Sequence, residues 1–195
     1  MKQTGIFGGS FNPIHCGHIA LAQEILRQTA LDEIWLMVSP QNPLKRQSDL
    51  LCDNERLRLA RKALRGIEGI SASNFEFTLP RPSYTWNTLQ ALSKTYPDRS
   101  FTLIIGGDNW TLFDRWYHAD DIRLHYPIVV YPRPGYLPAP HLSADSQLTL
   151  PPVTMVDCPL FDVSSTEIRQ RARQGDSLEG LVPDPIIDDV KQLYQ

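Results

Sequence analysis

The sequence has few cysteines, little net charge and no long hydrophobic run, and each of these shortages excludes a class of protein. Cys16, Cys52 and Cys158 are far apart and form no Cys-x-x-Cys pair, so neither a disulfide framework nor a redox motif is indicated. The net charge of -3 argues against a nucleic-acid-binding surface, which needs clustered lysine and arginine. No apolar run approaches the roughly 20 residues that span a bilayer, and the N-terminus shows no signal-peptide pattern. We therefore expect a cytoplasmic protein that binds neither nucleic acid nor membrane.

The composition is ordinary for a globular protein. Hydrophobic residues make up 42% and charged residues 21% of the chain, and 195 residues suffice for one sizeable core. No repeat, linker or low-complexity tract suggests a second module. The sequence therefore predicts a single domain over residues 1–195, with a variable loop over about 137–152 and a helical C-terminal part over about 166–195.

One stretch near the N-terminus combines glycine and histidine in a pattern suited to an anion. Gly8-Gly9-Ser10-Phe11-Asn12-Pro13-Ile14-His15-Cys16-Gly17-His18 joins a short apolar strand to a helix with an apolar period. Glycines allow close approach of a ligand, and a helix start presents unpaired N–H groups. His15 and His18 can both donate hydrogen bonds to phosphate oxygens. Zinc is the alternative, but a fourth ligand with suitable spacing is missing, so we predict no metal site.

This stretch resembles the signature of the nucleotidyltransferases that carry a His-x-Gly-His motif, and its full form is most similar to that of the bacterial nicotinate mononucleotide adenylyltransferases. The resemblance implies an α/β fold with a Rossmann-like, doubly wound and mostly parallel sheet, and a C-terminal helical segment. It also implies binding of ATP by Gly8, Gly9, Ser10, Phe11, His15 and His18, with His15 and His18 as catalytic residues.

Apolar and alternating patterns predict five further strands. These strands cover residues 33–38, 75–79, 101–105, 126–131 and 153–156. Asp53, Ser83 and Ser164 can each cap a following helix. Several basic residues crowd the helix after Asp53, and we interpret them as its solvated face without a catalytic role; they are Arg56, Arg58, Arg61, Lys62 and Arg65.

Asp108 follows the most apolar strand of the chain. The continuous run over 101–105 indicates burial on both faces, so Asp108 should emerge at the carboxyl end of a central strand. It could bind ribose hydroxyls or cap the next helix, and both roles can hold at once. The pattern Gly106-x-Asp108 with Trp116 downstream resembles that of the family. The resemblance implies adenosine ribose binding by Gly106 and Asp108, and stacking of Trp116 on a pyridine ring.

Three further segments resemble the acceptor site of the nicotinate enzymes. Ser83-Tyr84-Thr85 matches their Ser-Tyr-Thr pattern, although Pro82 stands where that pattern has glycine. Lys45 keeps the lysine of their Pro-Pro-His-Lys loop, although Leu44 replaces the histidine, and by composition alone this loop is a solvated one. Arg133 begins an Arg-Pro-Gly-Tyr segment. The resemblance implies an acceptor site formed by Lys45, Ser83, Tyr84, Thr85, Trp116, Tyr117 and Arg133.

A second candidate phosphate site lies near the C-terminal end. Ser164 and Glu167 fit a capping box, which is a sufficient structural reason for both residues. Hydroxyls and free N–H groups at a helix start, with Arg169 one turn further, also form a phosphate cradle. The segment resembles the family motif Ile-Ser-Ser-Thr-x-Ile-Arg, with Val163 for the first isoleucine. The resemblance implies ATP binding by Ser165, Thr166 and Arg169, with Arg169 catalytic.

The resemblance covers essentially the full chain and implies adenylyl transfer from ATP, accompanied by Mg²⁺, to nicotinate mononucleotide. The main alternative is another acceptor, namely nicotinamide mononucleotide, flavin mononucleotide or phosphopantetheine, against which residues 83–85 and 116–117 argue. A dinucleotide-dependent oxidoreductase is disfavoured because the first turn lacks Gly-x-Gly-x-x-Gly. A nucleotide sensor without turnover is least favoured, since every phosphate-contacting residue of the motif is present. The sequence leaves both a monomer and a homo-oligomer open.

Overall fold

A six-stranded parallel sheet forms the centre of the protein. The computed structural model describes residues 1–40, 50–136, 151–159 and 162–195. The strands follow the order β3-β2-β1-β4-β5-β6, and every neighbouring pair is parallel. This order is typical of doubly wound, Rossmann-like folds, so the predicted fold class is confirmed. The strands are β1 (Lys2–Gly9), β2 (Glu33–Val38), β3 (Ile70–Ser73), β4 (Arg99–Gly106), β5 (Ile128–Tyr131) and β6 (Val153–Met155).

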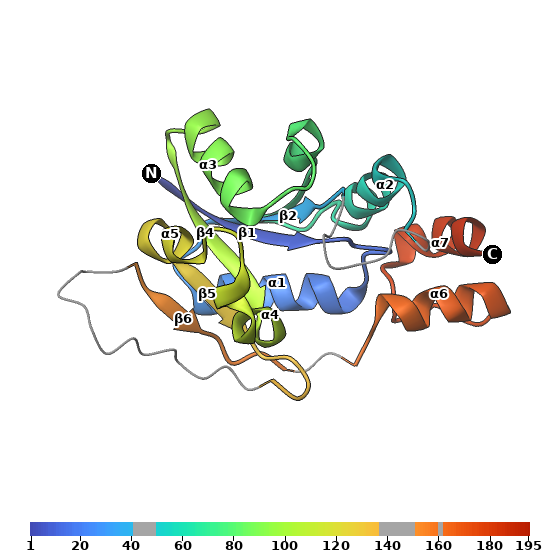
Figure 1. Cartoon of the computed structure of the whole chain (residues 1–195). Coiled ribbons are helices and arrows are strands. Elements are labelled where there is room, and N and C mark those ends of the chain that lie inside the picture. Colours follow the sequence, from blue (N-terminus) through green and yellow to red (C-terminus); the bar gives the residue numbers. More distant parts are fainter. Residues whose placement is uncertain (41–49, 137–150, 160–161) are drawn as a thin grey trace.

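Helices cover both faces of the sheet, and α1 and α3 lie on opposite sides of β1 (Figure 1). Side chains alternate along β1, so that Ile6 packs into the α3 side of the core and Phe7 into the α1 side. One face carries α1 (Cys16–Gln28), α2 (Asp53–Ala63), α6 (Ser165–Gln174) and α7 (Ile187–Tyr194). The other carries α3 (Thr85–Thr95), α4 (Gly107–Thr111) and α5 (Ala119–His125).

The strand order reverses at β1, which pairs with β2 on one side and with β4 on the other. Successive helices therefore leave the carboxyl ends of β1 and β4 toward opposite faces, and a crevice opens between them. Ligands of open α/β sheets bind at such a crevice. β1 ends at Gly9 and β4 at Gly106, so two of the segments predicted to bind ATP meet there.

The strand predicted over 75–79 is wrong. Phe75–Thr78 is a short 3-10 helix, and the strand lies just before it, at Ile70–Ser73. The Ser73 hydroxyl accepts a hydrogen bond from the Phe75 N–H, which turns the chain out of the strand. A strand would place Phe75 and Phe77 on the same face, whereas in the 3-10 helix they pack against opposite clusters of the core.

Two predicted helix caps are displaced. The residue before α2 is Cys52, with Asp53 inside the first turn, and the residue before α3 is Tyr84 rather than Ser83. Asp108 likewise lies within the first turn of α4. Ser164 does cap α6, since its hydroxyl accepts from the Glu167 N–H at 3.1 Å.

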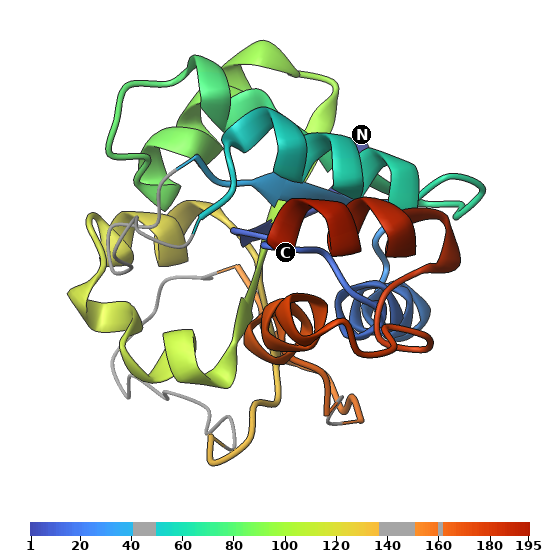
Figure 2. The same ribbon diagram turned by 90° about the vertical axis from the view of Figure 1, so that its right-hand side faces the viewer.

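The C-terminal helices complete the α1 side of the molecule, in agreement with the C-terminal helical segment of the predicted fold class. α6 and α7 lie side by side, and α7 runs along α2 (Figure 2). Asp189 of α7 binds Arg58 and Lys62 of α2 at 2.9 and 2.6 Å. No described helix is both long and apolar enough to cross a membrane. Residues 137–150 of the predicted variable loop lie outside the described residues.

Candidate active site

Two adjoining cavities lie at the carboxyl ends of β1 and β4. The larger has a volume of about 300 Å³ and the smaller of about 50 Å³. Phe7 and Tyr131, whose rings are 5.6 Å apart, line both cavities and so form a shared wall. The larger cavity is bordered by Gly8, Gly9, Ser10 and Gly106 on the sheet side, and by Ser83, Tyr84, Thr85, Trp116 and Tyr117 opposite. The smaller is bordered by His15, Gly17, His18 and Arg133.

The segment 8–18, here called the His loop, holds its two histidines as a stacked pair. His15 precedes the first residue of α1 and His18 lies in its first turn, with the ring centroids 3.6 Å apart. The His15 N–H donates to Nδ1 of His18 at 3.3 Å. Nδ1 of His18 is therefore an acceptor, and the proton of the neutral ring is on Nε2. The Phe11 ring packs edge-on against His18 at 5.0 Å and restrains its orientation.

His15 is neutral at physiological pH. Burial, and secondarily the charge of Arg133, lowers the pKa of His15 to about 4. Its Nδ1 is buried and has no hydrogen-bond partner among the described residues. His15 can therefore donate to an anion as a neutral imidazole but contributes no positive charge.

The start of α6 is tied directly to the His loop. Arg169 donates from Nη1 to the Asn12 carbonyl at 2.8 Å, and the Ser165 hydroxyl donates to the Pro13 carbonyl at 3.0 Å. Nη2 of Arg169 also approaches the Thr166 hydroxyl at 3.3 Å. These contacts join residues 152 and 157 positions apart. The structure thus places the two predicted phosphate-binding segments side by side.

Asp108 and Arg133 meet beside Gly106. Nε of Arg133 lies 3.8 Å from Oδ1 of Asp108, an atom with no hydrogen-bond partner among the described residues. A Cβ atom at Gly106 would lie 2.5 Å from Asp108 Oδ1 and 3.0 Å from Arg133, so any other residue there would displace these two side chains. Arg133 was predicted to bind the acceptor. Its side chain lies with Asp108 and His15, next to the smaller cavity.

Most residues predicted to bind the acceptor line the larger cavity. Trp116 packs on Phe113 with 5.4 Å between the ring centroids, which leaves the cavity side of the indole for a ligand. The rings of Tyr84 and Tyr117 lie 4.8 Å apart, and both are exposed. Lys45, the remaining member of the predicted set, lies outside the described residues.

Arg56 corrects the interpretation of its helix as a solvated basic face. The side chain is fully buried. It donates to the carbonyl groups of Ser10 at 2.6 Å and Ser39 at 3.0 Å, to that of Leu51 at 3.0 Å, and to the Asp53 carboxylate at 2.6 Å. Arg56 therefore fastens the chain leaving β1 to the chain leaving β2.

Glu76 is a site residue that the sequence did not reveal, because its segment was predicted to be a strand. It is 6% exposed and lines the larger cavity. Its Oε1 accepts from the Thr88 hydroxyl at 2.8 Å, whereas Oε2 is buried without a partner among the described residues. Burial raises the pKa of Glu76, against hydrogen bonds from Ser39 and Thr88 that lower it.

A resident metal does not fit the described part of the site. Among those residues, no three His, Cys, Asp or Glu side chains come together as a metal-binding group. The Glu76 carboxylate accepts a hydrogen bond from the neutral Thr88 hydroxyl, and the Asp108 carboxylate lies 3.8 Å from the basic Arg133.

Comparison with known proteins supports one family. A family model described as cytidylyltransferase-like matches residues 6–171. The chain is 49% identical over 173 residues to a probable nicotinate-nucleotide adenylyltransferase of Bacteroides fragilis, over 89% of this chain and 83% of the relative. It is 42% identical to a probable nicotinate-nucleotide adenylyltransferase of Cytophaga hutchinsonii, over 92% and 91% of the two chains.

Solved structures share the fold. A Plasmodium falciparum nicotinic acid mononucleotide adenylyltransferase complexed with NaAD aligns with a TM-score of 0.75 over 100% of this chain and 98% of that chain. At 18% identity this likeness concerns the fold alone.

Replacing Arg56 tests its structural role. Arg56→Met should lower the free energy of unfolding by about 3 to 5 kcal/mol, because three carbonyl groups lose their buried donor and Asp53 keeps only its second partner, Arg81. Arg61→Met, on the exposed face of the same helix, should change it by about 0.5 kcal/mol or less. Urea unfolding of both variants measures the difference, and equal small effects would contradict the role.

Replacing Glu76 tests its buried charge. Because its folded-state pKa lies above the ordinary 4.5, the wild type loses stability as pH rises from about 4.5 through the folded pKa. Glu76→Gln keeps the acceptor for Thr88 but does not titrate. Its melting temperature relative to wild type should therefore rise as pH increases from 5 to 8. Thermal melts across this range measure it, and a constant difference would show that Glu76 does not carry the effect.

Proposed function

The chain belongs to the cytidylyltransferase-like family and, within it, to the nicotinate-nucleotide adenylyltransferases, and from this we propose that it transfers the adenylyl group of ATP to nicotinate mononucleotide. The products are nicotinate adenine dinucleotide and pyrophosphate, a step of NAD biosynthesis. The observation that carries the proposal is the pair of hydrogen bonds by which Ser165 and Arg169, at the start of α6, bind the Pro13 and Asn12 carbonyl groups of the His loop.

The ATP side is assigned to the His loop, the end of β4 and the start of α6. The space beside Gly8 is open, since a Cβ atom there would meet nothing within 4 Å. The ring of Phe11 is buried in the core, so this residue offers only its backbone. Asp108 is suited to the adenosine ribose through Oδ1, which accepts no hydrogen bond from the described residues. The full set is Gly8, Gly9, Ser10, Phe11, His15, His18, Gly106, Asp108, Ser165, Thr166 and Arg169.

The reaction needs little acid or base chemistry. The second pKa of a phosphate monoester is about 6, so the acceptor phosphate is ionised at neutral pH and can attack the α-phosphorus of ATP directly. The bond from that phosphorus to the bridging oxygen breaks, and pyrophosphate leaves with the electron pair. Catalysis then rests on positioning and on stabilising the developing charge. Nε2–H of His18 and the guanidinium fork of Arg169 are the donors for that charge, with His15 as a neutral donor beside them.

Mg²⁺ enters this scheme as part of the substrate. Mg²⁺ usually keeps several waters and binds through one or two carboxylates together with substrate phosphates. The described residues offer no carboxylate cluster to hold it independently. We therefore assign Mg²⁺ to the triphosphate of bound ATP, and the compensating protein charge to Arg169 and Arg133.

The acceptor is assigned to the larger cavity. Trp116 can stack on the pyridine ring, which contributes about 0.5 to 1.5 kcal/mol beyond burial. Thr85 and Tyr117 can offer backbone N–H groups, and Thr85 a hydroxyl, to the ring carboxylate. Ser83 adds a buried hydroxyl without a partner among the described residues. The location of Arg133 supports a contact with phosphate rather than with the pyridine ring.

The acceptor assignment predicts a preference for the acid over the amide. Neutral donors bind a carboxylate through charge-assisted bonds, whereas the NH₂ of an amide leaves them unsatisfied at about 1 to 3 kcal/mol per buried group. Two mismatches give a ratio on the order of 10² to 10⁴ in kcat/KM. Pyrophosphate release with ATP and each mononucleotide measures this ratio. Equal values, or a preference for nicotinamide mononucleotide, would show that the acceptor assignment is wrong.

A matched pair of variants locates the preference. Thr85→Val removes one of the proposed donors and should shrink the acid-to-amide ratio about tenfold, by the loss of one charge-assisted bond. Thr95→Val removes a hydroxyl at the far end of the same helix, where it donates only to the Ala91 carbonyl, and should leave the ratio unchanged.

A further inference from the structure

A tyrosine of α7 that lines neither cavity is hydrogen-bonded to the His loop. The Tyr194 hydroxyl donates to Oδ1 of Asn12 at 2.7 Å. The two side chains are 6% and 5% exposed, so this bond is shielded from water. Burial raises the pKa of Tyr194, which keeps the hydroxyl protonated and able to donate at any physiological pH.

Asn12 connects the His loop to three parts of the chain at once. Its Oδ1 accepts from Tyr194 and from the Leu51 N–H at 3.2 Å, while its carbonyl accepts from Arg169 at 2.8 Å. Arg169 is the residue assigned to the phosphates. A movement of Asn12 would therefore shift the guanidinium of Arg169. It would also shift the residues that flank Asn12 in the His loop.

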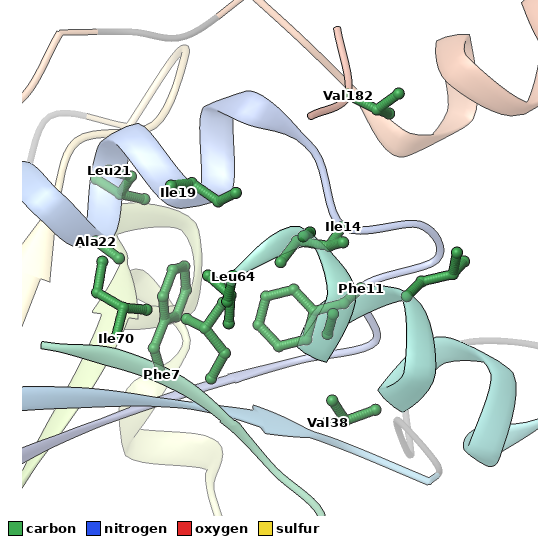
Figure 3. Close-up of a cluster of buried hydrophobic side chains, with 14 of the residues drawn as sticks. Phe7, Phe11, Ile14, Ile19, Leu21, Ala22, Val38, Leu64, Ile70 and Val182 are labelled. Atoms are coloured by element: carbon green, nitrogen blue, oxygen red, sulfur yellow. The ribbon is translucent and has the colours of Figure 1, made fainter. Parts of the chain in front are cut away.

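The backbone next to Asn12 needs such restraint. Phe11 has φ of +44°, in the left-handed region that is unfavourable for a bulky residue. Such conformations persist only where the surroundings impose them, and they cluster at ligand sites. The ring of Phe11 is buried beside Ile14 and Val38 (Figure 3), and Arg56 fixes the Ser10 carbonyl on the other side. Tyr194 supplies the corresponding fixed point at Asn12.

We propose that Tyr194 is a positioning residue of the adenylyl-transfer site. It acts through Asn12 to hold the His loop and Arg169 in fixed positions relative to each other. Tyr194 lines neither cavity, so the effect is indirect. The inference rests on the proposed function, because it concerns the rate of that reaction.

The test compares two buried tyrosines. Tyr194→Phe removes the hydroxyl that holds Asn12, and kcat for pyrophosphate release should fall about tenfold, within the range that small misplacements of reacting groups cause. KM for nicotinate mononucleotide should change less than about twofold. Tyr126→Phe is the control, because Tyr126 is also 6% exposed and its hydroxyl binds Ser93 at 3.0 Å, away from the His loop. It should lower the melting temperature comparably and leave kcat unchanged.

A double-mutant cycle separates positioning from stability. Asn12→Ala removes the acceptor of the same bond, so Tyr194→Phe should lower kcat far less in the Asn12→Ala background than in the wild type. If the two substitutions lower kcat independently, so that their fold-changes multiply in the double variant, the proposal is wrong. A Tyr194→Phe variant that loses stability but keeps wild-type kcat would also overturn it. Absence of pyrophosphate release by the wild type would instead contradict the proposed function.

Discussion

The hydrogen bonds from α6 to the His loop are the interaction on which the rest of the site depends. Arg169 and Ser165 donate to the successive carbonyl groups of Asn12 and Pro13, and so bring the starts of α1 and α6 together. Both helix starts carry the positive end of a helix dipole, and their convergence favours a polyanion between them. The strand order determines where the two helix starts meet. The chain leaves the sheet at the carboxyl end of β1, which is where the strand order reverses.

Local patterns were sufficient to predict much of this arrangement. The apolar runs at 33–38 and 101–105 correspond to β2 and β4, because burial on both faces leaves a continuous apolar signal. Local patterns failed where a residue's neighbours come from elsewhere in the chain. Arg56 shares a helix face with the buried Ala60 and Ala63, a spacing that could have indicated its burial, but the carbonyl groups it binds follow other strands. The environment of Glu76 depends on a turn at the edge of the sheet, for which no local pattern exists.

The unsatisfied polar atoms of the described residues are concentrated at the site. Four buried side-chain atoms there lack a hydrogen-bond partner, and they belong to His15, Glu76, Ser83 and Asp108. Three of these residues line the two cavities, and Asp108 lies beside Gly106 at their border. A buried polar atom without a partner typically costs about 1 to 3 kcal/mol, so a fold selected for stability alone would not gather four of them in one place. Their positions fit a protein whose stability is partly given up for ligand binding.

The central claim is that the His loop and the start of α6 form a single phosphate site. Amide hydrogen exchange, with and without a non-hydrolysable ATP analogue and Mg²⁺, tests it directly, because it reports on each segment separately. The account predicts that the analogue slows exchange in peptides covering residues 8–18 and, at the same analogue concentration, in peptides covering 164–169. Protection of one segment with unchanged exchange in the other would contradict it.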